Sequence, residues 1–428
     1  MEIKTTSVAL EKARIFLEKS QSPNGSWSVT GTFSHKEPPY YLKEIVLTPE
    51  AISALVLINS NKSLNAVSKA LNFCLKHVLT DRDHLDMWAW RAVALSLSNA
   101  KICKEELAQA VAFLEKQQAA EGYWPSFPST YNLTNFSVLY SIRKTAKEPA
   151  LKKARAWLMK NKARDRNGWG FNHESQESEV SYTGNVIKAL ILAGEDALSN
   201  ELQEARVFLE SKQLADGGWP SSKTTIADKS TTYGTAFATI SLMLLSENPF
   251  NKNIEKGIKF LLEAQSEDGG WPLVKGEKGE FYTTYYTTYA LALYRYLKEN
   301  LDNPKFAYLK EKLKPQQLSQ FLLQNFEDQK YNWLSTATEK SAITERMLGS
   351  TFDAVMRRKD ILKVLSHKGE LTIAGIIDLL KEDAKYEHLN KRSHITLVKN
   401  DLDYLKALNL VTELDSRYFA SIDLLSPQ

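Results

Sequence analysis

The chain is poor in cysteine. Cys74 and Cys103 are its only two cysteines in 428 residues, and no histidine or cysteine spacing around them matches a zinc site. We therefore expect neither a disulfide framework nor a thiolate metal centre. Both side chains are predicted to be core thiols of a reduced, cytoplasmic protein, and no metal or other cofactor is expected.

Long apolar runs and an excess of one charge are also missing. No window approaches 18 uninterrupted apolar residues, and the opening MEIKTTSVALEKARIF lacks the basic and then apolar pattern of a signal peptide. A membrane span and export are therefore not expected. Lys and Arg number 55 against 51 Asp and Glu, a net charge of +4, which argues against a strongly basic nucleic-acid binder but leaves room for a local patch.

The sequence does contain an internal repeat. The stretches QSPNGSW, QQAAEGYWP, QLADGGWP and QSEDGGWP each place a glutamine six residues before a tryptophan, namely Gln21, Gln118, Gln213 and Gln265. Phe-Leu precedes each glutamine at the same distance. A fifth copy keeps Gly168-Trp169 without the glutamine, and a degenerate copy fits between the first two. The period therefore predicts six units in residues 1–300.

Each unit predicts two helices joined by the Gly-Trp loop. The first is amphipathic, as in LQEARVFLESKQ, and the second is apolar on most sides, as in TTYGTAFATISLMLL. Such pairs bury their apolar surface best as two concentric rings with the apolar helices inside. We expect the glycines to provide special backbone angles, the tryptophan to pack between units, and the glutamine amide to hold loop backbone groups.

These repeats resemble the QW motif of the squalene/terpene cyclase and protein prenyltransferase superfamily. The resemblance covers about two thirds of the chain and implies an α/α toroid. It says less about function, because one fold hosts many chemistries.

The catalytic sets of that superfamily are not plainly present. Class II terpene cyclases carry a DxDD motif whose acid protonates an alkene or epoxide, and no DxDD occurs here. The nearest stretch, DRDHLDMWAW, leaves Asp86 as the candidate proton donor with His84 beside it. The alternative is that Asp86 only caps an inner helix. The Asp, Cys and His zinc ligands of the prenyltransferases have no counterpart near Cys74 or Cys103.

Aromatic and acidic residues gather where the inner helices are predicted to begin. If these ends face the centre of the ring, they form an aromatic cavity with an acidic rim that suits an apolar or cationic ligand. The alternative is that they fill a closed core. The predicted cavity residues are Trp88, Trp90, Glu179, Tyr182, Asp228, Tyr233, Tyr282 and Tyr285.

The pattern changes after residue 300. Residues 301–354 are predicted to be a helical connector, and residues 355–428 a separate domain with helices near 358–367, 372–383 and 391–408 and strands at LVTEL and RYFAS. This order resembles winged helix-turn-helix domains. In that arrangement the third helix would direct a core stripe inward, formed by Ile395, Val398, Leu402 and Leu405.

Winged helices commonly place the third helix in the DNA major groove. The residues predicted to contact nucleic acid are Lys391, Arg392, Ser393, His394, Thr396, Lys399 and Arg417. Residues 351–428 nevertheless contain twelve basic and twelve acidic residues. Because phosphate contacts supply much of the affinity for DNA, a neutral domain suits a protein partner about as well.

We therefore expect a mostly α protein with a six-unit α/α toroid and a C-terminal winged-helix domain. The leading functional hypothesis is a non-catalytic regulator or accessory subunit, whose toroid binds a ligand or partner and whose winged helix binds DNA or protein. The alternative is a divergent class II terpene cyclase-like enzyme with Asp86 as proton donor. No pattern identifies an oligomeric state.

Overall fold

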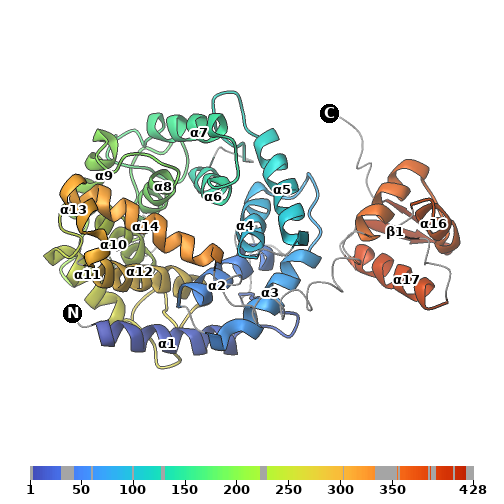
Figure 1. The fold of residues 1–428 in the computed structure, drawn as a ribbon, viewed down its shortest axis with the longest axis horizontal. Helices are drawn as coiled ribbons and strands as arrows, with labels where there is room; N and C mark the ends of the chain where they lie inside the picture. The colour runs from blue at the N-terminus through green and yellow to red at the C-terminus, as the bar shows by residue number, and fades with distance from the viewer. Residues whose placement is uncertain are drawn as a thin grey trace. The chain divides into compact units, whose positions relative to one another are not determined.

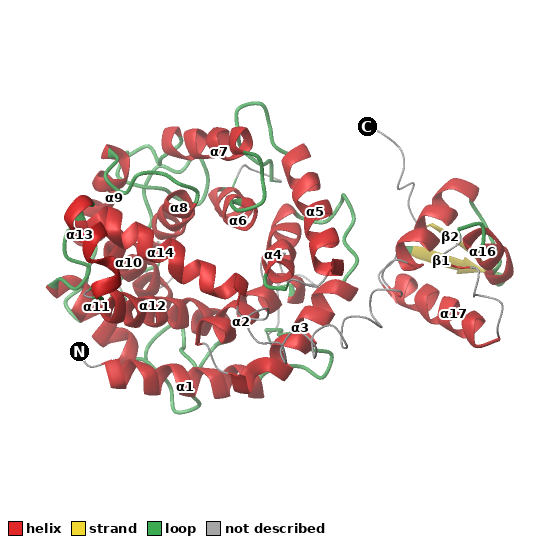
Figure 2. Ribbon diagram, in the orientation of Figure 1, coloured by secondary structure: helices red, strands yellow, loops and turns green. Residues whose placement is uncertain are grey.

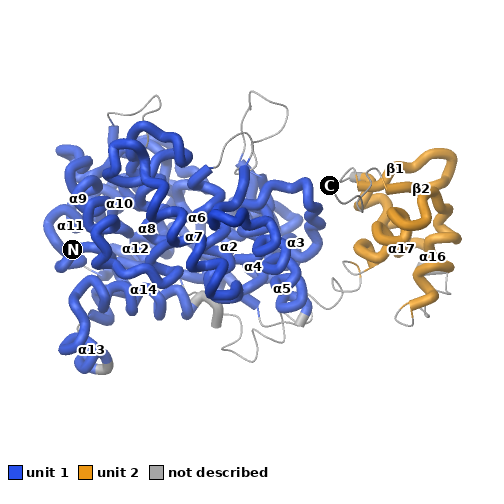
Figure 3. The backbone as a smooth tube through the Cα atoms, turned by 90° about the horizontal axis from the view of Figure 1, so that it is seen from above, with its two compact units in different colours: residues 1–344 blue, residues 345–428 orange. Residues whose placement is uncertain are grey.

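The structure is a computed structural model. It describes residues 3–29, 43–58, 61–98, 101–126, 131–221, 229–301, 303–332, 354, 357–383, 386, 392–407 and 410–420. The chain divides into two compact units, residues 1–344 and 345–428 (Figure 3). Each unit is described by itself.

Unit 1 consists of helices that alternate along the chain between an outer and an inner ring (Figure 1). The outer helices are α1 (Ile3–Lys19), α3 (Leu64–Lys76), α5 (Lys101–Lys116), α7 (Glu148–Lys160), α9 (Asn200–Ser211) and α11 (Lys252–Glu263). The inner helices are α2 (Glu44–Ile58), α4 (Leu85–Ser96), α6 (Asn132–Ile142), α8 (Val180–Leu192), α10 (Thr232–Leu245) and α12 (Phe281–Asn300). Each inner helix contacts the next one, and α12 contacts α2, so the inner ring is closed.

Burial follows the predicted pattern. Every residue of α10 except Tyr233 is buried, whereas α11 buries one face, including Ile254, Ile258 and Leu261. An apolar helix is stable only when neighbours cover it on all sides, and the inner ring provides this cover. The mostly helical, toroidal fold expected from the sequence is therefore present (Figure 2).

A loop with the motif glycine and tryptophan joins five of the six outer helices to the following inner helix; residues 77–84, between α3 and α4, contain neither residue. In the copy at Trp271 the indole Nε1–H donates to the Leu261 carbonyl at 2.6 Å, and the backbone N–H donates to Thr284 Oγ1 at 2.8 Å. Gly269 has a φ of +92°, and a Cβ there would lie 2.6 Å from the Lys12 carbonyl oxygen. The glycine is therefore needed both for its backbone angle and for the close approach of α1.

The motif glutamines also connect neighbouring units, which the sequence did not indicate. Gln265 Nε2 donates to the Gly269 carbonyl in its own loop at 2.9 Å and to the Ala9 carbonyl at 2.8 Å, and so joins the last repeat to the first helix. The other glutamines reach the following outer helix in the same way, at Ala66, Ala150 and Asn253. In the copy without glutamine, Lys162 Nζ takes this role, bonding the Arg166 carbonyl and Glu204.

We expect Gln265→Ala to weaken the closure of the ring. The substitution removes two hydrogen bonds and leaves two carbonyls without this donor, which should cost about 1–2 kcal/mol. Equilibrium denaturant unfolding measures the loss, and faster amide exchange in α1 locates it. Glu267→Ala, an exposed change in the same loop, should have little effect; an equal loss in both variants would contradict a role for Gln265 in closure.

The segment after the ring is not a simple connector. A short helix α13 (Ala307–Lys312) leads into α14 (Pro315–Asn332), and α14 contacts the inner helices α2, α8, α10 and α12. It buries Leu318, Leu322 and Phe326 against them. The division between the units, at 344 and 345, therefore leaves α14 in unit 1.

Unit 2 contains a helix over residues 357–368, then α16 (Ile373–Leu380), α17 (Arg392–Ala407) and the antiparallel strands β1 (Val411–Leu414) and β2 (Arg417–Ala420). The hairpin turns at Asp415 and Ser416, which both have positive φ. Val398, Leu402 and Leu405 are buried as predicted, but Ile395 is 48 % exposed. The predicted stripe was therefore wrong at its first position, because the first turns of α17 extend beyond the core.

Among the residues described, no helix combines the length and apolarity that crossing a bilayer requires.

Candidate functional site

The sequence-predicted acid lies at the beginning of inner helix α4. His84 is the N-cap residue of this helix and Asp86 lies in its first turn, so the expectation that Asp86 itself is the cap was wrong. The Asp86 carboxylate is 2 % exposed. Its Oδ2 lies 2.8 Å from His84 Nδ1 and accepts a hydrogen bond from Thr134 Oγ1 at 2.8 Å.

These contacts define what Asp86 can do. His84 Nδ1 lies 2.8 Å from the Asp86 carboxylate but 3.3 Å from the Asp86 backbone nitrogen. A proton on Nδ1 is therefore placed to donate to the carboxylate. His84 and Thr134 thus hold the Asp86 carboxyl group in one orientation, at a place where the sequence offered no flanking carboxylates.

A second carboxyl group, Glu50 of α2, lies deeper in the ring and was missed from the sequence. Its Oε1 accepts a hydrogen bond from Tyr286 at 2.7 Å, and its buried Oε2 has no hydrogen-bond partner among the described residues. Burial raises the pKa of Glu50 to about 8, Lys188 opposes the rise and Asp86 adds to it. The group is therefore mainly protonated at neutral pH.

Lys188 of α8 provides a buried cation near these acids. It is 1 % exposed, and its Nζ lies 4.7 Å from the ring centre of Tyr289 and 4.9 Å from that of Tyr140. Phe237 and Tyr286 lie slightly farther away, at 5.9 Å. The faces of these rings stabilise the ammonium group by cation–π attraction.

Four of the predicted cavity residues form one aromatic cluster at the ring centre. The rings of Tyr233 and Tyr282 stack with their centres 5.0 Å apart, and the Tyr282 hydroxyl donates to the Tyr233 hydroxyl at 2.6 Å. The rings of Trp90 and Tyr285 pack in a T-shaped arrangement with their centres 6.2 Å apart. Tyr285 is fully buried and Trp90 is 4 % exposed, whereas Tyr233 and Tyr282 are half-buried at the end where the inner helices begin.

Three further predicted cavity residues are described, and each makes its own contacts. Trp88 packs at a tilt against Phe113 of outer helix α5, with the ring centres 4.4 Å apart, and donates to the Thr80 carbonyl, so its placement in the cavity was wrong. The ring of Tyr182 packs edge to face with that of Phe171, a loop residue, with the ring centres 5.7 Å apart. Glu179 is the N-cap residue of α8. Asp228 lies outside the described residues.

The predicted nucleic-acid residues of unit 2 are only partly described. Lys391 lies outside the described residues, and only the backbone is described for Arg392, Ser393 and His394 at the start of α17. Thr396 and Lys399 are exposed on α17. Arg417 is exposed on β2, with its Nε 3.6 Å from Glu370.

The described parts of α17 and the hairpin carry exposed apolar and acidic groups as well as basic ones. Ile395, Leu397 and Leu414 are all at least 40 % exposed. Glu413 of β1 pairs with Lys406 and accepts a hydrogen bond from Tyr418 at 3.0 Å. Phosphate backbones are bound by clusters of uncompensated positive charge, and the described side chains here do not form such a cluster.

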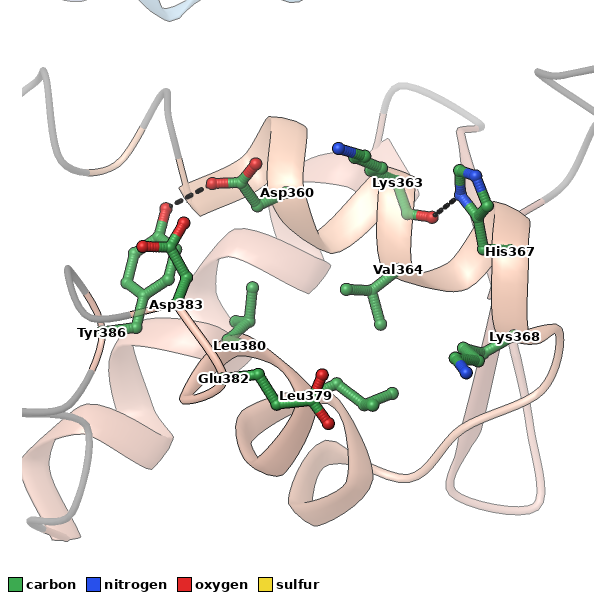
Figure 4. Close-up of a pocket in the computed structure, with 10 residues that line it drawn as sticks. All are labelled: Asp360, Lys363, Val364, His367, Lys368, Leu379, Leu380, Glu382, Asp383 and Tyr386. Carbon is green, nitrogen blue, oxygen red and sulfur yellow. Dashed lines mark hydrogen bonds between the residues drawn. The ribbon is translucent and has the colours of Figure 1, made fainter.

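A separate pocket of about 310 Å³ lies between the helix at 357–368 and the end of α16 (Figure 4). Val364, Leu379 and Leu380 form its apolar floor. Lys363, His367 and Lys368 line one side, while Asp360 and Asp383 lie on the other, where Tyr386 donates to Asp360 at 2.7 Å.

No metal centre is evident in the parts of the chain that are described: no cluster of three or more His, Cys, Asp or Glu side chains occurs there. Cys74 and Cys103 are free and buried, as expected of core thiols.

Comparison with known proteins connects unit 1 to terpene cyclases. Residues 180–298 match the squalene-hopene cyclase C-terminal domain. The chain is 30 % identical over 152 residues to lanosterol synthase from Saccharomyces cerevisiae, which is 33 % of this chain and 20 % of that protein. It is 28 % identical over 173 residues to squalene–hopene cyclase from Zymomonas mobilis, 36 % of this chain and 25 % of the relative. The chain thus spans about a fifth to a quarter of these relatives' length.

A solved structure shares the fold. The type II terpene cyclase MstE from Scytonema superposes with a TM-score of 0.54 at 15 % identity, covering 69 % of this chain and 99 % of that one. A single-residue variant of that enzyme in complex with geranylgeranyl dihydroxybenzoate, its substrate, gives a TM-score of 0.51 at 15 % identity, covering 68 % of this chain and 96 % of that one. At such identity the similarity concerns the fold alone. Unit 1 is therefore a terpene cyclase-like helical toroid.

Proposed function

We propose that unit 1 is a terpene cyclase-like enzyme that binds an isoprenoid chain in the toroid and protonates it with Asp86. The observation that carries this proposal is the arrangement of Asp86: a buried carboxyl group held by His84 and Thr134, beside an aromatic cluster. The similarity to terpene cyclases supports the isoprenoid as substrate class.

The proposed reaction is a redox-neutral isomerisation. The Asp86 carboxylic acid gives its proton to a terminal alkene carbon, and the electron pair of that double bond forms the new C–H bond. The resulting tertiary carbocation is attacked by a second double bond of the chain, which closes a ring. Loss of a proton from the last cation restores an alkene, and Asp86 regains a proton before the next cycle.

The aromatic cluster and Lys188 limit where in the toroid the carbocation of the substrate can be stabilised. Trp90 and Tyr285 offer ring faces and edges near α4, and aromatic faces attract a cation. Beyond them the rings of Tyr140 and Tyr289 already flank the Lys188 ammonium group. Like charges repel, so we expect the carbocation to stay on the Asp86 side of Lys188.

We expect Asp86→Asn to abolish conversion of the substrate. An amide cannot supply the proton, so the rate should fall by about 10²–10⁴-fold. The protein is incubated with squalene and with geranylgeranyl dihydroxybenzoate, and the products are identified by mass spectrometry. Asp81→Asn, an exposed change in the preceding turn, should retain activity. Conversion by Asp86→Asn at the wild-type rate would remove Asp86 from the mechanism.

The order of elements in unit 2 favours a second candidate function. Three helices followed by a hairpin, with Leu371 bridging to Tyr418 of β2, are typical of a winged helix. We propose that this unit binds a protein partner through α17 and the hairpin, and that unit 1 is then a non-catalytic regulator or accessory subunit. Exposed Ile395, Leu397 and Leu414 support a protein partner over duplex DNA.

A gel-shift titration of duplex DNA at low salt distinguishes these partners. We expect no salt-sensitive shift, because residues 351–428 contain equal numbers of basic and acidic residues. A shift that weakens steeply with salt and is lost when Lys391, Arg392 and Lys399 are changed together would instead identify DNA as the partner.

A further inference from the structure

Helix α14 covers the end of the inner ring opposite Asp86. Gln324 Nε2 donates to the carbonyl of Leu192, the last residue of α8, at 3.1 Å, and Gln320 Nε2 donates to the Glu195 carbonyl at 2.8 Å. Lys144, just after α6, pairs with Asp328. Figures 1 and 3 show α14 lying across the inner helices along one side of unit 1.

Glu327 carries a carboxylate from α14 into the ring. It has no exposed surface. Its carboxylate accepts hydrogen bonds from the hydroxyls of Tyr289 at 2.6 Å and Tyr140 at 3.2 Å, and pairs with Arg143 Nη2 at 2.7 Å. Two phenols and one guanidinium from two different inner-ring segments thus converge on a single acidic group.

Lys188 lies against the same two tyrosines. Its Nζ is within 5 Å of the ring centres of both Tyr140 and Tyr289, whose hydroxyls bond Glu327. The side chains that hold Glu327 are therefore themselves packed beside a buried amine.

The donors around Glu327 also have the chemistry of an oxyanion site. A guanidinium and hydroxyl groups bind phosphate or carboxylate oxygens by charge-assisted hydrogen bonds. Removal of α14 would leave Arg143, Tyr140 and Tyr289 at the mouth of an aromatic ring interior. A ligand suited to that arrangement combines an oxyanion with an apolar chain.

We propose that Glu327 is a built-in occupant of an oxyanion-binding site, and that an amphiphile carrying a phosphate or carboxylate group displaces α14 to bind there. Helix α14 then acts as an autoinhibitory plug of the toroid. The proposal is compatible with the isoprenoid function but does not require turnover of a substrate. It is tested by ligand binding and amide exchange, whereas the role of Asp86 is tested by product formation, so either can fail without the other.

Hydrogen–deuterium exchange of the full chain tests this proposal. The probes are dodecyl phosphate, inorganic phosphate and dodecanol, each added below the concentration at which micelles form. We expect dodecyl phosphate to raise amide exchange in α14 by about tenfold or more, and dodecanol to leave it unchanged. The same rise with inorganic phosphate alone would assign the site to free oxyanions. No rise with either phosphate would overturn the proposal.

Two variants and a matched control test the proposal further. Glu327→Gln removes the negative charge that binds Arg143 and the two tyrosine hydroxyls, so the internal group competes less well for the site. Dodecyl phosphate should then bind about tenfold more tightly, which corresponds to about 1.4 kcal/mol. Glu299→Gln, an exposed change at the end of α12, is the matched control and should bind like the wild type. Arg143→Gln should lose binding of the phosphate probe. Unchanged affinity in folded Glu327→Gln would contradict the proposal, and the wild-type exchange result stands even if a variant fails to fold.

Discussion

Asp401→Ala should unfold unit 2 while leaving unit 1 folded. The Asp401 carboxylate, on α17, accepts hydrogen bonds from Arg357 Nε at 2.6 Å and Arg358 Nε at 2.7 Å, both from the helix at 357–368. All three side chains are nearly inaccessible to solvent. Without the carboxylate, two guanidinium groups stay buried together, and breaking a buried pair in this way costs about 3–5 kcal/mol.

That loss is large for so small a unit, because whole domains are stable by only about 5–15 kcal/mol. Amide exchange measures the effect separately in the peptides of each unit. Asp403→Ala is the matched control, since its carboxylate lies two residues away on the same helix and is half-exposed; it should change stability by less than about 0.5 kcal/mol. Equal protection of unit 2 in both variants would contradict the role of Asp401.

Glu50→Gln should make unit 1 more resistant to unfolding at high pH. Glu50 keeps its proton in the folded protein up to about pH 8, against an ordinary pKa of 4.5. Between these values the folded state binds more protons than the unfolded state, so stability falls as pH rises. The full effect of this shift is on the order of 5 kcal/mol. A glutamine does not titrate and should remove this part of the pH dependence.

Denaturant unfolding at pH 5 and pH 9 measures the difference. We expect the variant to gain stability relative to the wild type between these two pH values, with Tyr286, Lys188 and Asp86 facing the same group in both proteins. Glu44→Gln at the first turn of α2 is the control and should give parallel curves. A wild-type stability that does not fall relative to Glu50→Gln above pH 6 would mean that Glu50 ionises normally.

The sequence by itself determined the ring and its turns. The spacing of Gln265 and Trp271 recurs in three other copies, and all four form the same hydrogen bonds from the indole and the amide. Such features are local and periodic: glycine backbone angles, a tryptophan at fixed distance and an amphipathic helix can all be read within one unit. The boundaries of the helices and hairpin in unit 2 followed from similar local patterns.

Tertiary structure alone decided what lies at the ring centre. Trp88 and Trp90 are two residues apart, and about 100° of rotation per residue directs them to opposite sides of α4, so only Trp90 faces inward. Lys188 is the single charged residue of α8, and Glu50 lies inside an apolar stretch of α2. Both are unusual in the sequence, but the sequence does not identify their partners. Glu327 meets Tyr140 across 187 residues of sequence. Contacts between such distant segments follow no period, and only the closed ring brings them together.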